Sequence, residues 1–228
     1  MSRVQRGAEN VDLDGGKNSG PSLGALADCV RWLILYGMLA AVFLALGATG
    51  VDVIGLFRDP AEVSRLSLPV WEGSFSLLGY MIWTAAATAC LLTAAVVRAR
   101  QESGRAGFLA ATGTIALLLA LDDALLFHEH FADAFGGRGR GSVIILIPYA
   151  AVALAWAIRY RSEILTSRLG PLLAAGLGFV GSFALEFTPG GRLPQADVLE
   201  EVLELGGLFM FALYCVSESY RELVPCVR

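Results

Sequence analysis

The chain has 228 residues, of which 56% are hydrophobic and only 17% are charged, and its formal net charge at pH 7 is −4. An average soluble domain carries about 25% charged residues, and a water-soluble fold of this length has no means of burying so much apolar surface, so the composition excludes an ordinary soluble globular domain. The negative net charge also argues against a nucleic-acid partner, and membrane lipid is the partner that we expect.

The chain begins with a polar segment. Residues 1–27 are rich in Gly, Ser and Asn and show no apolar periodicity, so we expect a disordered cytoplasmic tail. A transmembrane domain is expected over residues 28–220, and residues 221–228 are expected to form a short cytoplasmic C-terminal tail.

Six apolar blocks follow the polar segment. In chain order they cover residues 29–51, 75–97, 107–127, 143–158, 171–187 and 198–216. A helix of roughly 20 apolar residues crosses a hydrocarbon layer of about 30 Å, and a helix satisfies its own backbone hydrogen bonds, as a segment in lipid must. The sequence therefore predicts an all-α polytopic integral membrane helix bundle with six transmembrane helices. Pro148 interrupts the fourth block, and the fifth is short and glycine-rich.

The arginines predict the orientation of the bundle. They gather before the first block, between the second and third, between the fourth and fifth, and after the sixth. By the positive-inside rule we expect both termini on the cytoplasmic side of the inner (plasma) membrane. The cysteines, Cys29, Cys90, Cys215 and Cys226, then lie toward the cytoplasm, where thiols stay reduced, so we expect no disulfide.

The third block carries charged residues inside an apolar run. Residues 119–133 read LALDDALLFHEHFAD, which places Asp122 and Asp123 within a turn or two of the outer membrane surface. His128, Glu129 and His130 follow at the outer interface. On one continuous helix, at about 100° per residue, Asp122 and Glu129 share a face.

The sixth block brings a second acidic group to the same depth. It runs inward from QADVLEEVLELGG, with Glu200 and Glu201 near the outer surface and Glu204 one turn deeper, all on one helix face. We therefore expect Asp122 or Asp123 to approach Glu201 or Glu204 between the third and sixth spans.

Carboxylates clustered in a membrane need positive compensation. A charge near the centre of a span costs about 2.5–3.5 kcal/mol, and repulsion between like charges adds to that cost. Three sources of compensation remain open: a divalent metal, protons, or arginines of the outer loops. A metal held by carboxylates and imidazoles is expected to be Zn, Fe, Mn or Mg. Its candidate ligands are Asp122, Asp123, His128, Glu129, His130, Glu201 and Glu204.

These residues support more than one function. The first hypothesis is a membrane-embedded enzyme in which the metal acts on a lipid or small amphiphile, with Asp122, Asp123 and Glu201 as catalytic carboxylates. The second is a proton- or cation-coupled transporter that uses the same residues as its binding site. A noncatalytic membrane assembly factor is the third.

Some of the acidic residues also fit simpler roles. Asp197 and Glu200 have the spacing of a helix N-cap and its reciprocal partner. Glu129 and His130 fit a solvated loop outside the hydrocarbon.

Overall fold

The computed structural model describes residues 23–69, 71–127, 131, 140–186 and 194–224, and these residues form helices and no strands. Six helices are long: α1 (Leu23–Ala48), α3 (Ser74–Ala99), α4 (Ser103–Leu125), α6 (Arg140–Arg159), α8 (Leu169–Glu186) and α9 (Pro194–Leu223). Each of them covers most of one predicted apolar block. The all-helical class is therefore confirmed.

Apolar stretches in these helices indicate a membrane protein. Three stretches are long and apolar enough to cross a membrane, namely Val30–Ala48, Ser74–Ala99 and Gly104–Leu125. The apolar stretches of α6 and α8 are shorter, over Ile147–Arg159 and Leu169–Leu185. Crossing of the membrane by α6, α8 and α9 remains a prediction.

Within the described residues, three short helices lie between the long ones, and they were not predicted from the sequence. They are η1 (Ile54–Phe57) and α2 (Pro60–Arg65), which precede α3, and α7 (Arg161–Leu165), which precedes α8. Helix α2 starts where it does because the Asp59 side chain accepts hydrogen bonds from the backbone N–H groups of Ala61 and Glu62. Arg58 ties this segment to the start of α3 through an ion pair with Glu72 at 2.8 Å.

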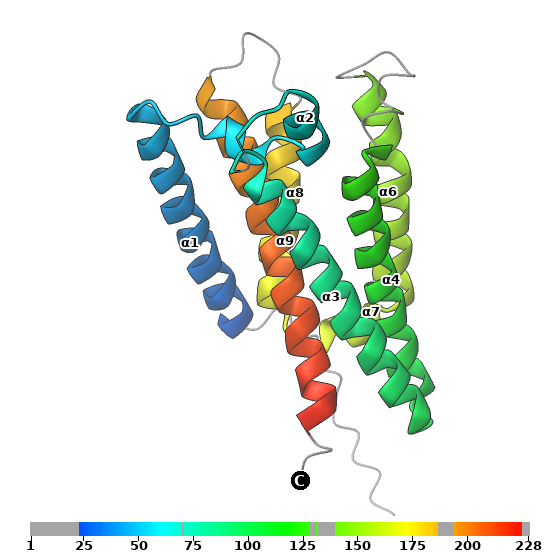
Figure 1. Cartoon of the computed structure of the whole chain (residues 1–228). Coiled ribbons are helices and arrows are strands. Elements are labelled where there is room, and N and C mark those ends of the chain that lie inside the picture. Colours follow the sequence, from blue (N-terminus) through cyan, green and yellow to red (C-terminus); the bar gives the residue numbers. More distant parts are fainter. Residues whose placement is uncertain (1–22, 70, 128–130, 132–139, 187–193, 225–228) are drawn as a thin grey trace, which may run out of the picture.

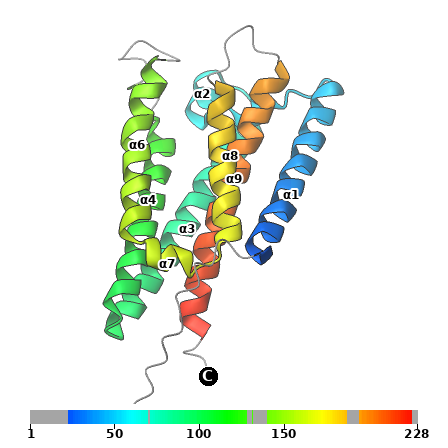
Figure 2. The same cartoon turned by 180° about the vertical axis from the view of Figure 1, so that it is seen from behind.

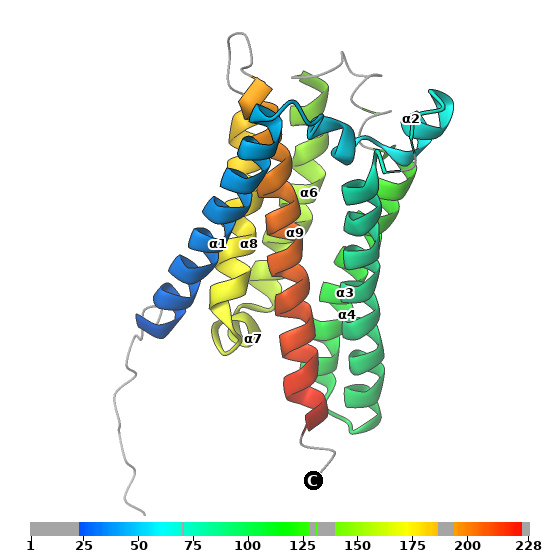
Figure 3. The ribbon, with the colours of Figure 1, turned by 60° about the vertical axis from the view of Figure 1, so that its left-hand side comes forward.

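The long helices run side by side in alternating directions (Figures 1 and 2), with α2 near one end of the bundle and α7 toward the other. Helix α3 packs along both α4 and α9, α8 packs along α9, and α1 contacts α8 and α9. Figure 3 shows the result, with α1 at one edge, α3 and α4 at the other, and α8 and α9 between them.

Glycines allow close helix contacts. A Cβ atom on Gly178 of α8 would lie 2.8 Å from the Leu203 carbonyl oxygen and 2.9 Å from the Gly207 Cα of α9. Helix α1 is attached by Tyr36, whose hydroxyl donates to the Gly206 carbonyl at 2.6 Å. Since the Tyr36 ring lies against Gly206, no larger residue fits there without a shift.

Candidate carboxylate site

Helix α4 holds, near its C-terminal end, the two aspartates that the sequence singled out. The Asp122 side chain is 8% exposed and hydrogen-bonded to the Tyr149 hydroxyl of α6. Asp123 accepts a hydrogen bond of 2.9 Å from the Trp83 indole N–H of α3. Three helices therefore meet around this pair of carboxylates, and two neutral donors orient them.

Helix α4 ends sooner than the sequence indicated. It stops at Leu125, and Leu126 adopts a left-handed conformation (φ 52°, ψ 36°) while its N–H still bonds to the Asp122 carbonyl. The shared helix face expected for Asp122 and Glu129 assumed one continuous helix, and that assumption is wrong because the helical register breaks at Leu126. His128, Glu129 and His130 lie outside the described residues.

The acidic residues of α9 lie in its first half. Glu200 and Glu201 are half-buried and Glu204 is exposed. Asp197 lies in the first turn of a helix that already begins at Pro194, so the expectation that it is the N-cap is wrong. A carboxylate in the first turn still interacts favourably with the helix dipole.

The two acidic groups lie on helices that are mostly separated by α3. Helices α4 and α9 each pack along α3 and touch each other little. Trp83 of α3 contacts helices on both of its sides. Its N–H donates to Asp123 of α4, and its ring packs against Phe179 of α8 and Phe211 of α9, with ring centroids 6.2 and 5.6 Å apart. Within the part of the chain that the structure describes, no three His, Cys, Asp or Glu residues form a group that could hold a metal ion.

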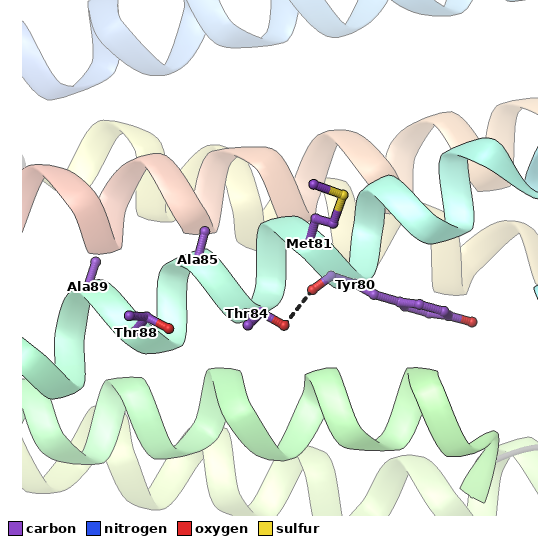
Figure 4. A pocket seen from close by; sticks show the side chains of 6 residues that line it. All are labelled: Tyr80, Met81, Thr84, Ala85, Thr88 and Ala89. Atoms are coloured by element: carbon purple, nitrogen blue, oxygen red, sulfur yellow. Dashed lines mark hydrogen bonds between the residues drawn. The ribbon is translucent and has the colours of Figure 1, made fainter.

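A shallow groove, open to the outside and lined by one helix only, runs along α3. It has a volume of about 670 Å³ and is lined by Tyr80, Met81, Thr84, Ala85, Thr88 and Ala89. In Figure 4 the side chains of Tyr80, Thr84 and Thr88 lie on the side toward α4, and Met81 and Ala85 lie on the other side. Tyr80 and Thr84 flank Trp83 in the sequence, so the groove reaches the depth of Asp123.

A second ionic cluster lies toward the opposite end of the bundle, and the sequence analysis missed it. Glu218 of α9 is fully buried and pairs with Arg105 of α4 at 2.5 Å. It also accepts hydrogen bonds from Arg221 at 3.1 Å and from the backbone N–H of Arg168 at 3.0 Å. Arg105 bonds in addition to Glu222 at 2.7 Å. Glu218 thus joins α4, α9 and the segment between α7 and α8.

A family model described as a domain of unknown function, DUF8692, matches residues 30–218. The chain belongs to this family. Neither a curated protein nor a solved structure matches it.

The matched part of this DUF8692 protein contains both acidic groups and ends at Glu218. Sequence reasoning did not single out Trp83 and Tyr149, which contact the aspartates, or Arg105 and Glu218, which form the ionic cluster. A signal existed for Glu218, since an arginine follows three residues later and an arginine opens the third span. No sequence signal connected Trp83 or Tyr149 to the aspartates.

Proposed function

We propose that Asp122 and Asp123 form a proton- or cation-binding site in the outer half of a six-span inner-membrane bundle with cytoplasmic termini, and that the protein is a proton- or cation-coupled transporter. The observation that carries this proposal is the contact of buried Asp122 with the Tyr149 hydroxyl. A carboxylate and a phenol in contact provide both a proton acceptor and a donor. An ionisable residue inside a span costs free energy, so its presence there favours a functional role.

Trp83 provides a direct measurement of this site. In a variant that keeps Trp83 and replaces Trp32, Trp71 and Trp156 with Phe, protonation of Asp123 changes the charge next to the indole N–H. We expect the Trp83 fluorescence emission to change with pH in the detergent-solubilised protein. It should also change at constant pH when a cation that binds to the site is added. Asp123→Asn should abolish both changes.

Glu62→Gln is the matched control, since Glu62 is exposed on α2 and lies outside the site. It should retain both responses, and all variants should elute as the parent does in size-exclusion chromatography. Emission that is independent of pH and of cations, or a response that persists in Asp123→Asn, would contradict the proposal.

A metal-dependent enzyme acting on a lipid or small amphiphile is the second candidate. The groove along α3 favours it, because this surface is largely apolar, carries two threonine hydroxyls and reaches the depth of Asp123. In this case a divalent metal, Zn, Fe, Mn or Mg, would polarise the substrate, and a carboxylate such as Asp122 or Glu201 would move the proton.

Elemental analysis separates the two candidates. For the enzyme, the purified protein should contain a stoichiometric divalent metal, which Asp123→Asn and Glu204→Gln release without unfolding the protein. Purification without a chelator that yields no stoichiometric metal would remove this candidate and would leave the transporter or an assembly factor.

A further inference from the structure

Two buried thiols meet where α3 packs on α9. Cys90 and Cys215 are both free, and each is 0% exposed. The Cys90 thiol lies 3.9 Å from the Cys215 carbonyl oxygen, and the two thiols are close enough to interact. Both residues belong to the largest apolar core of the bundle.

The position of Cys90 is restricted from the side of α4. A Cβ atom on Gly113 would lie only 2.9 Å from the Cys90 Cβ, so α4 packs directly behind this cysteine. The Ser219 hydroxyl lies 3.9 Å from the Cys90 sulfur and contacts it from α9. Packing therefore holds the Cys90 thiol against Cys215.

We propose that Cys90 and Cys215 are a redox-active pair that a lipid-soluble quinone oxidises to an intramolecular disulfide joining α3 to α9. The two S–H bonds break and one S–S bond forms, while two electrons and two protons reduce the quinone to a hydroquinone. A dithiol reductant reverses the step by thiol–disulfide exchange when the helices open transiently.

The surroundings determine the class of oxidant. Ions and strongly polar reagents pay a large desolvation cost in an apolar core, whereas an uncharged quinone dissolves in the bilayer and enters when the helices open transiently. Reduced thiols are the resting state expected on the cytoplasmic side of a membrane, where disulfides are usually transient and redox-sensing.

The test uses the full chain with Cys29→Ser and Cys226→Ser, so that only the buried pair remains. The protein in liposomes is treated with a decyl-substituted benzoquinone, denatured without reductant and labelled with a polyethylene-glycol maleimide. Untreated protein should take up two labels and treated protein none, and the intact mass should fall by two hydrogen atoms. Dithiothreitol should restore both labels.

Cys90→Ser in the same background is the control, and it should keep its single label after quinone treatment. The disulfide should also raise the thermal midpoint of unfolding in the parent and not in the control, because it closes a loop between residues 125 positions apart. Persistence of both labels, a mass gain from added oxygen, or a disulfide-linked dimer would overturn the proposal.

Discussion

At the scale of single residues, acidic side chains of the described residues are buried at two places in the bundle. Asp122 lies within the apolar run of α4 and is buried there. Glu218 follows the last apolar block in a polar segment that resembles a solvated helix end. Its burial depends on Arg105, which lies 113 positions away in the chain. Pairing over that distance depends on helix packing, which the local pattern does not contain.

Glu218→Gln should destabilise the bundle strongly. The substitution keeps the size of the side chain and removes the negative charge, so Arg105 and Arg221 lose their shared buried partner. Removing one member of a buried ion pair costs about 3–5 kcal/mol. The free energy of unfolding, measured by denaturant titration in detergent micelles, should fall by that order.

Glu222→Gln tests whether burial determines this cost. Glu222 also pairs with Arg105, but its side chain is partly exposed and the Glu218 contact remains in the variant. Its loss in unfolding free energy should be clearly smaller. Equal losses in the two variants would show that Glu218 does not hold the central position assigned to it.

At the scale of helices, the long helices could be predicted from the sequence and the short ones could not. Six apolar blocks predicted six long helices, whereas η1, α2 and α7 are too short to have a recognisable period. The end of α4 was misplaced because the left-handed residue is Leu126, where a glycine is the usual signal. The start of α9 was misplaced because Pro194 opens the helix before Asp197.

Gly178→Ala should weaken the packing of α8 on α9. The added methyl group would meet backbone atoms of Leu203 and Gly207 at 2.8 and 2.9 Å, and backbone atoms cannot turn aside. Overpacking of this kind costs about 1–3 kcal/mol. The thermal midpoint of unfolding in detergent should fall.

Gly176→Ala on the same helix is the control. A Cβ atom there meets nothing within 4 Å, and alanine favours a helix over glycine by about 0.5–1 kcal/mol. Its thermal midpoint should stay the same or rise. If the thermal midpoint of Gly176→Ala fell as far as that of Gly178→Ala, the loss in Gly178→Ala could not be assigned to its contact with α9.

At the scale of the whole molecule, the sequence predicted which segments are helices but not which helices are neighbours. The expected approach of Asp122 or Asp123 to Glu201 or Glu204 assumed that the third and sixth spans are neighbours, whereas α4 and α9 each pack mainly against α3. That approach stays a prediction. Trp83 illustrates why the sequence could not predict which helices are neighbours. An apolar ring such as that of Trp83 is typical of any buried position, so its type did not indicate that its N–H bonds to Asp123.

Single-cysteine labelling with a membrane-impermeant maleimide should establish the topology. In a background without Cys29 and Cys226, cysteines replacing Ser64, Ser142 or Gly190 should react from outside intact cells. Cysteines replacing Ser103 or Thr166 should react only after the membrane is opened. Reaction of position 166 from outside would contradict the six-span topology, and reversed sidedness at every position would contradict the predicted orientation.

The attachment of α1 has a consequence for how the protein is made. Tyr36 bonds to carbonyl groups 138 and 170 positions later in the chain, so α1 leaves the ribosome long before α8 and α9 exist. Helices α3 and α4 are consecutive and can pair at once. Helix α1 has no packing partner in the lipid at that stage. Its composition suits this, because its span has a mean hydropathy of 1.9 and only 11% of the span is buried in the bundle. We therefore expect membrane insertion to precede docking for this helix, which can take its place at the edge of the bundle (Figure 3) only after the last helix has been synthesised.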